Sequence, residues 1–126
     1  MDPQQEIFMA IRESLSEGYE VYDAGLPPEG TPYPFIHLGE TVLNDGTTKS
    51  ALFGNVSQTI NFWSNDLKKR GSFSEMMRVA KKKCRNISRT KNFGWMVTNI
   101  NETVLHDDTT SSTLLHGILI IEFRFS

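Results

Sequence analysis

The segment from Val56 to Trp63 alternates apolar and polar positions with a period of two residues. Successive side chains of a strand point to opposite faces of a sheet, so this pattern predicts a half-buried strand. One set of alternate positions is Val56, Gln58, Ile60 and Phe62, and the other is Ser57, Thr59, Asn61 and Trp63. We expect the first set to face the protein core.

A long helix is predicted after this strand, from Ser72 to Arg89. Ser72 and Glu75 have the spacing of a capping box, in which two side chains satisfy free backbone N–H groups of the first turn. The charged segment 68–71 is expected to form the preceding turn. The apolar positions that follow fall on one side at about 100° per residue, so this side should lie on a sheet. They are Phe73, Met76, Met77, Ala80, Cys84 and Ile87.

The two predicted helices carry opposite charges on their polar sides. The basic side of the second helix consists of Arg78, Lys81, Lys82, Arg85 and Arg89. A first helix is predicted to start at Asp2 and Pro3 and to end near Gly18. Its apolar face consists of Ile7, Phe8, Ile11 and Leu15. Its acidic side, with Asp2, includes Glu6, Glu13 and Glu17.

The remaining pattern predicts further strands over 20–23, 35–43, 93–105 and 113–125. Segment 24–34 holds four prolines and two glycines, which excludes regular structure there. The centre of the last strand, 117–121, is apolar at positions of both faces, so we expect this strand to lie inside the sheet. A turn is predicted over 106–110.

The order of these elements is α-β-β-β-α-β-β. Strands in hairpin-like groups with one connecting helix predict an α+β fold, with a mainly antiparallel sheet of four to five strands and two helices packed on it. The 126 residues fit a single domain over 1–126. A polar connection over 44–55 is long for a hairpin and contains the apolar Leu52 and Phe53. These two residues either cap the core or form a contact for a partner.

Charge is distributed unevenly along the chain. The formal net charge is −2, from 13 basic and 15 acidic residues, and 11 of the bases lie between positions 49 and 91. A single cysteine allows no internal disulfide and fits a reducing compartment. No run of about 18 apolar residues and no signal-peptide pattern occurs, so no membrane association is expected.

No catalytic or metal-binding motif stands out. The histidines His37, His106 and His116 lack metal-ligand spacing with one another or with the cysteine. Cys84 lies on an apolar helix face, where cysteine is usually inert. His106 beside two aspartates fits a polar turn. We therefore expect no enzyme, no metal and no cofactor, although a site assembled from distant residues would leave no local motif.

The charged helix faces allow three interpretations. The basic face could bind nucleic acid non-specifically through Arg78, Lys82, Arg85 and Arg89. It could also be a solvated helix surface. Finally, the acidic and basic faces could bind each other, either within one chain or between neighbouring copies in a head-to-tail contact.

Three stretches, in order, resemble one protein family. They are the first helix with Val21-Tyr22-Asp23 and the segment 32–39, then Gln58-Thr59-Ile60-Asn61-Phe62-Trp63-Ser64 with its charged turn and helix, and finally Leu115-His116-Gly117-Ile118-Leu119. In this order and spacing, which extend over essentially the full length, the chain resembles the tail-completion, or tail-terminator, proteins of long-tailed phages and prophages.

The resemblance implies a structural protein without catalytic residues. Such proteins form hexameric rings on the end of the tail tube, stop tube growth and dock to the head connector. Its partners would be other copies of itself, the major tail tube protein and the head connector protein. It would work in the host cytoplasm during assembly and then in the virion, at the head–tail junction. The interface is expected at the acidic and basic helix faces and at Leu52 and Phe53.

Overall fold

The computed structural model describes residues 2–23, 25, 27–45, 53–109 and 112–126. Its elements follow the predicted order, with one short additional 3-10 helix over Leu67–Lys69. The helices are α1 (Pro3–Ser16) and α2 (Arg70–Arg85). The strands are β1 (Val21–Tyr22), β2 (Phe35–Asp45), β3 (Gly54–Ser64), β4 (Trp95–Asp107) and β5 (Leu114–Phe125).

The strands form one sheet in the order β1-β2-β3-β5-β4. The short β1 pairs with β2 in parallel, and every other pairing is antiparallel. The α+β prediction, with its mainly antiparallel sheet, is therefore confirmed. The last strand, β5, lies between β3 and β4, as its apolar centre predicted.

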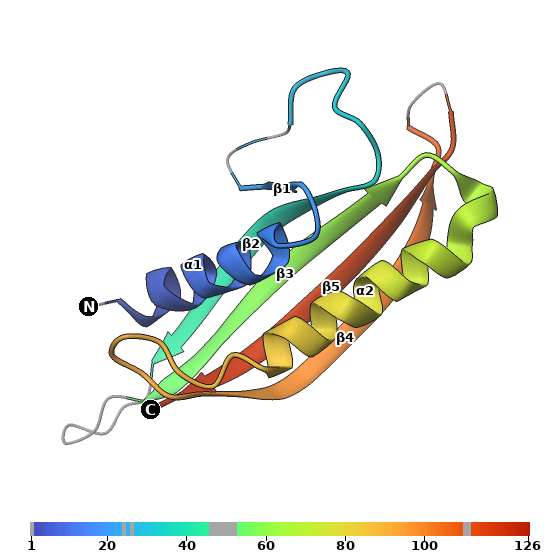
Figure 1. Cartoon of the computed structure of the whole chain (residues 1–126). Helices are drawn as coiled ribbons and strands as arrows, with labels where there is room; N and C mark the ends of the chain where they lie inside the picture. Colours follow the sequence, from blue (N-terminus) through green and yellow to red (C-terminus); the bar gives the residue numbers. More distant parts are fainter. Residues whose placement is uncertain (1, 24, 26, 46–52, 110–111) are drawn as a thin grey trace.

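Both helices pack on the same face of the sheet (Figure 1). Helix α1 contacts β2 and β3, while α2 lies over β5 and β4 and brings Phe73 and Met77 against Gly117. The side chains of β3 alternate strictly between buried and half-buried positions, and the buried set faces the helices. The core thus lies between one helical layer and one sheet.

Helix α1 begins as predicted. The carboxylate of Asp2 accepts a hydrogen bond from the backbone N–H of Gln4 at 2.9 Å, and Pro3 occupies the first turn. The helix ends at Ser16, and Gly18 follows it with a backbone N–H donated to Leu15 at 3.3 Å. Ile7, Ile11 and Leu15 are fully buried, which confirms the predicted apolar face.

The predicted start of the second helix is wrong. Helix α2 begins at Arg70, so the charged segment 68–71 is helical rather than a turn. Asp66 provides the cap, because its carboxylate accepts the N–H of Lys68 at 3.0 Å at the start of the 3-10 helix that leads into α2. Glu75 forms no capping box and instead accepts two hydrogen bonds from Arg78.

The predicted end of this helix is also wrong. Helix α2 ends at Arg85, and Asn86 follows as its C-cap. The chain then turns so that Ser88 accepts the backbone N–H of Trp95 at 2.9 Å and Arg89 pairs with Gly94 in an isolated bridge. These contacts set the direction in which the chain enters β4. Arg89, which was predicted to be helical, therefore lies outside α2.

Three strands extend beyond their predicted limits. Strand β4 continues to Asp107, so His106 lies in a strand and not in a turn. Strands β2 and β3 both enter the predicted loop over 44–55, with Asn44 paired with Asn55. The rest of that loop, including Leu52, lies outside the described residues. Cross-strand pairing thus continues into polar residues that have no strand signal of their own.

A buried glutamine fixes an irregularity in β2. The register with β3 shifts between Leu38 and Thr41. Gln58, which is fully buried, accepts the Thr41 hydroxyl and donates to the carbonyl oxygen of Gly39 at 3.1 Å. A bulge leaves backbone groups without ladder partners, and a side-chain amide can satisfy them. Gln58 therefore occupies a core position because its side-chain amide forms the hydrogen bonds that the bulge requires.

Candidate interaction surface

Within the described part of the chain, no helix lies on the second face of the sheet (Figure 1). On the two central strands, its residues are those that alternate with the core positions, and they pair directly across β3 and β5. From one end to the other these pairs are Trp63 with His116, Asn61 with Ile118, Thr59 with Ile120, Ser57 with Glu122, and Asn55 with Arg124. We call this surface the open face.

Most exposed apolar side chains of the described residues gather on the open face. Ile120 is 41% exposed and Met96 is 64% exposed, while Val42 and Leu105 are exposed to 43% and 46%. Met96 and Leu105 pair with Arg124 and His116 of the open face, which places them on the same side. A group of exposed apolar residues on one side of a domain is typical of a contact surface.

Charged residues are scarce on this face. The ten open-face positions of β3 and β5 include one acid, Glu122, and one base, Arg124. The cores of protein–protein interfaces are depleted in charge and retain aromatic and apolar groups. At about 4.8 Å between strands and about 3.3 Å per residue, four strands of roughly 11 residues span about 700 Å². That approaches the roughly 800 Å² that each partner contributes to a standard interface.

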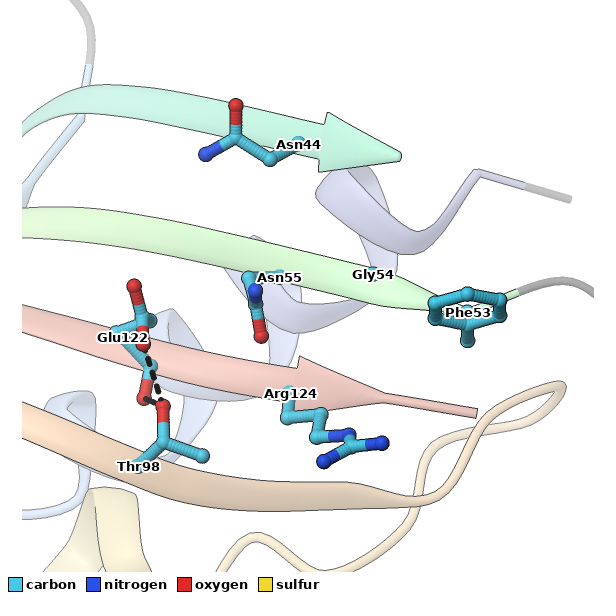
Figure 2. Close-up of a pocket in the computed structure, with 7 residues that line it drawn as sticks. All are labelled: Asn44, Phe53, Gly54, Asn55, Thr98, Glu122 and Arg124. Carbon is cyan, nitrogen blue, oxygen red and sulfur yellow. Dashed lines mark hydrogen bonds between the residues drawn. The ribbon is translucent and has the colours of Figure 1, made fainter. Parts of the chain in front are cut away.

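A polar hollow of about 470 Å³ lies at one end of the open face (Figure 2). Thr98 donates its hydroxyl to a carboxylate oxygen of Glu122 at 2.7 Å, which orients that acid toward β4. The Arg124 guanidinium has no ion-pair partner among the described residues. Half-buried Phe53 lies at the edge of the same hollow, where β3 begins. The expected contact residue Phe53 is thus placed beside a free cation.

An aromatic stack closes the other end of the open face. The rings of Trp63 and His116 lie parallel, with centroids 3.8 Å apart and an angle of 9°. Asn61 fixes the imidazole through a contact of 2.8 Å between its side-chain oxygen and His116 Nε2. Burial lowers the pKa of His116, and the nearby Asp107 carboxylate only partly opposes this effect. The imidazole is therefore neutral at pH 7.

Intrachain ion pairs engage several charges of the two helices, although the base that meets the predicted acidic face, Lys83, was not on the predicted basic face. Lys83 donates to Glu17 at 3.0 Å, which ties the two helices together. Arg78 pairs with Glu75 on its own helix, and Lys81 pairs with Glu102 of β4 at 2.7 Å. Some bases of α2 are therefore neutralised within the chain, and the contact between neighbouring copies stays a prediction.

Four bases near the end of α2 have no ion-pair partner in the described part of the chain. All four are exposed, and we call them the basic end; they are Lys82, Arg85, Arg89 and Lys91. Arg89 shares a shallow hollow with Glu13 and Glu17, but in the described part of the chain it pairs with neither, and Glu17 pairs with Lys83 instead. Glu13, expected at an interface, is exposed and also unpaired among the described residues.

Glu6 forms hydrogen bonds to the segment that follows α2 in its own chain. One of its carboxylate oxygens accepts the Thr90 hydroxyl and the Asn92 backbone N–H, at 2.6 and 3.0 Å, and the other accepts the Asn92 amide. The Thr90 hydroxyl in turn accepts the Trp95 indole N–H at 2.8 Å. Hydrogen bonds from Thr90 and Asn92 lower the pKa of Glu6. The acid was expected at an interface, but its oxygens are used within the chain.

We expect Glu6→Gln to change how stability depends on pH. A lowered pKa in the folded state adds stability above the ordinary carboxyl pKa of 4.5, and this contribution is lost as the pH falls through the lowered value. Urea midpoints of wild type and variant should differ most at neutral pH and converge in acid. Glu13→Gln, which removes an unpaired acid from the same helix, is the control. A difference that stays constant down to acid pH would contradict this role.

The remaining candidates for chemistry are separate from one another. Burial raises the pKa of Cys84 to about 12, so its thiol stays protonated. Among the described residues, no group of three or more His, Cys, Asp or Glu side chains could hold a metal ion. His106 is exposed on β4. None of the helices in the described part is both long and apolar enough to cross a membrane.

Residue patterns alone did not indicate the open face, although its signal was present. The positions between the core residues of β3 are Asn55, Ser57, Thr59, Asn61 and Trp63, which suit an uncovered but low-charge surface. The apolar centre of β5 predicted a strand inside the sheet, which the structure confirms, but it did not predict which face the helices cover. The structure buries Leu119 and Ile121 and leaves Ile120 exposed, because both helices lie on one side.

No protein-family model and no curated protein matches this sequence. Solved structures do share the fold over nearly the whole chain. A chain in the virion of the native gene transfer agent particle has a TM-score of 0.58 at 13% identity, covering 98% of this chain and 93% of that chain. The bacteriophage SPP1 gp17 protein has a TM-score of 0.60 at 20% identity, covering 95% of this chain and 88% of that chain. At these identities the similarity establishes a common fold with these two proteins.

Proposed function

We propose that this chain is a structural protein of a phage tail, which completes the tail by capping its tube and joining it to the head. The observation that supports this most strongly is the fold similarity to two virion proteins, which extends over 95–98% of the chain. It agrees with the ordered resemblance of three sequence stretches to tail-completion proteins. The role requires binding surfaces and no chemical step.

The surfaces described above suit such a role. A low-charge open face with exposed Ile120 and Met96 offers a broad contact, and the basic end offers unpaired charge at one end of the domain. A protein that joins two assemblies needs separate contacts for its own copies and for its partners. We propose a ring of copies, with the major tail tube protein and the head connector protein as its two partners.

Loss of the gene provides the decisive test. In a phage or prophage that encodes this chain, its deletion should leave filled heads and separate tails, or tubes of excessive length, in electron micrographs. Expression of the chain from a plasmid should restore joined particles. Normal infectious particles without the gene would refute the proposed function. Purified protein mixed with tail tubes should also appear at one tube end in micrographs.

A nucleic-acid-binding module is the second candidate, because the basic end is exposed and unpaired among the described residues. Fewer of the predicted phosphate-binding residues are unpaired than the sequence suggested, since Arg78 is paired with Glu75. Binding through about four phosphates would weaken steeply as salt rises. A labelled DNA duplex that shows no binding to the chain at low salt would exclude this candidate.

Charge reversal at the basic end should impair particle assembly. We expect the triple variant Lys82→Glu, Arg85→Glu and Arg89→Glu to keep its fold, because exposed substitutions usually change stability by less than about 0.5 kcal/mol each. Complementation of the deletion strain should nevertheless yield at least tenfold fewer joined particles, since like charges would now face each other across a contact. Infectious titre and micrographs provide the measurement.

The control reverses the same amount of charge at the other end of α2. Lys68, Lys69 and Arg70 precede the helix or open it, where acidic side chains favour the helix dipole. Their replacement by glutamate should therefore leave the fold and the titre close to wild type. Equal losses from both triple variants would indicate a general charge effect rather than a contact at the basic end.

A further inference from the structure

A second hollow lies beside the aromatic stack, at the end of the sheet where β3 and β4 finish and β5 begins. It measures about 570 Å³. Its outer wall is the proline-rich segment between β1 and β2, and its floor comes from the strand ends. The residues that define its chemistry are Pro27, Pro32, Tyr33, Trp63, Glu29 and Asp107. We call it the proline-loop pocket.

The aromatic part of this pocket is held in place by neighbouring rings. Tyr33 packs on Phe35 with ring centroids 5.3 Å apart, and Phe35 is buried at the base of the loop. Trp63 is fixed by its stack on His116. His37 holds the loop through a contact of 2.6 Å between its Nε2 and the Gly25 carbonyl oxygen. The pocket is therefore preformed, which reduces the entropy cost of filling it.

The full charges of the pocket lining are both negative. Asp107 accepts the N–H and the hydroxyl of Thr109 on one carboxylate oxygen, at 2.9 and 2.5 Å. The other oxygen accepts no hydrogen bond within the described residues. These contacts lower the pKa of Asp107, so the group is ionised at neutral pH. Glu29 is exposed on the loop and has no ion-pair partner in the described part of the chain.

Aromatic rings beside free carboxylates are suited to one class of ligand, a cationic side chain. An ammonium or guanidinium group is attracted to the face of an indole or phenol ring, and its apolar stem packs against proline. A carboxylate adds a charge-assisted hydrogen bond, which is strongest with arginine because of its planar fork. A purely apolar ligand would leave the Asp107 charge without compensation.

The basic end lies at the opposite end of the sheet from the pocket. The bases before and at the start of α2, Lys68, Lys69 and Arg70, lie near the pocket end but do not line the pocket. Segment 86–94 after α2 pairs with the end of β5, which is next to Gly54 at the start of β3. The pocket lies beside Trp63, near the other end of that strand. Helix α2 runs along the sheet from the pocket end toward the basic end (Figure 1). Nine residues of strand correspond to about 30 Å, far beyond the length of an arginine side chain. The basic end cannot fill the pocket of its own chain.

We infer that the proline-loop pocket binds an arginine or lysine from the basic end of a second copy of this chain. The observations behind this are the complementary charges, the preformed aromatic walls, and the placement of the two sites at opposite ends of one rigid sheet. Two different surfaces in contact make a head-to-tail interface, which closes into a ring when the rotation between copies permits. The inference rests on the proposed ring-forming function and specifies the contact that builds it.

Sedimentation velocity of the full chain, over a concentration series at low and high salt, provides the first test. Wild type should self-associate at low salt and dissociate as salt rises. Asp107→Asn keeps the shape and the acceptor for Thr109 but removes the charge, and combined with Glu29→Gln it should weaken association by about tenfold or more. The control is Asp108→Asn, since Asp108 bonds Thr113 at 2.6 Å and does not line the pocket.

A mixing experiment then tests the head-to-tail geometry. The pocket variant Glu29→Gln, Asp107→Asn retains an intact basic end, and the variant Lys82→Glu, Arg85→Glu, Arg89→Glu retains an intact pocket. Each variant alone should be mainly monomeric at concentrations where wild type associates. Their mixture should form a 1:1 heterodimer and nothing larger, because only one productive contact remains for each pair.

Three results would each overturn this contact. They are a wild type that stays monomeric at low salt and at all concentrations, an Asp107→Asn, Glu29→Gln variant that associates like wild type, and a mixture without heterodimers. Circular dichroism of each variant establishes that the fold is kept. If the deletion strain fails to join heads and tails while the pocket variant fully complements it, the proposed function stands and this contact is rejected.

Discussion

Ile121→Ala is expected to lower the free energy of unfolding by about 2–5 kcal/mol, as large-to-small substitutions in buried cores do. Ile121 is fully buried under the helices in the middle of β5. Removing most of its side chain would lose transfer free energy and leave a cavity that the neighbouring strands cannot close. Urea unfolding followed by circular dichroism measures the change.

The adjacent Ile120 is the matched control, because it has the same side chain on the same strand. Its side chain points to the open face and is 41% exposed. We expect Ile120→Ala to cost less than about 1 kcal/mol, mainly from lost strand propensity and partial burial. Similar costs at both positions would show that the open face is covered in solution. If the loss of unfolding free energy caused by Ile120→Ala grows with protein concentration, another copy of the chain covers the open face.

Gly54→Ala is expected to destabilise the chain by about 1–3 kcal/mol, the usual cost of forcing extra atoms into a packed site. A Cβ atom at Gly54 would lie 2.3 Å from the carbonyl oxygen of Asn44 and 3.0 Å from the Phe125 ring. The first of these is backbone, so it moves only if β2 and β3 separate at their pairing. Melting temperature and the urea midpoint should both fall.

Gly71→Ala provides the opposite expectation with the same added methyl group. Gly71 lies in the first turn of α2, is exposed, and has no atom within 4 Å of the position of a Cβ. Alanine has a higher helix propensity, so stability should rise by up to about 1 kcal/mol. A destabilising Gly71→Ala, or a neutral Gly54→Ala, would contradict the described packing at these two positions.

These stability variants also separate folding from assembly. Ile121→Ala should reduce particle joining only as far as it reduces the amount of folded chain. Variants of the basic end and the proline-loop pocket should reduce joining at unchanged stability, because their side chains are exposed or line an open hollow. A joint measurement of urea midpoints and infectious titres therefore distinguishes an interface residue from a core residue.

Local patterns predicted the elements well because each of them is set by neighbouring residues. The alternation at Val56, Ile60 and Phe62 and the spacing of Phe73, Met77 and Cys84 matched the buried faces found in the structure. Predicted boundaries failed where a tertiary contact competes with a local signal. Asp66 caps the helix entrance in place of Ser72, and pairing with Gly94 ends the helix before Arg89.

The candidate site was predicted less well, for a physical reason. Charge patterns show which residues are charged but not which of them find a partner, and Lys83 and Glu17 meet although they are 66 positions apart. Glu6 was expected at an interface and instead binds Thr90 and Asn92 across the chain. Of the expected contact residues, Lys82, Arg85, Arg89 and Glu13 are exposed and unpaired in the described part of the chain, Phe53 is half-buried at a hollow, and Leu52 lies outside that part.

The sequence by itself determined the α+β class, the order of the elements and the core residues of each, because periodicity and turn residues act over a few positions. Only the tertiary structure decided that both helices cover one side of the sheet, which leaves Ile120 exposed. It also placed Asp107 and Trp63, which are 44 positions apart in the sequence, in one pocket beneath a proline-rich loop. Such surfaces depend on how whole elements pack, and packing is settled by contacts between residues that are distant in the chain.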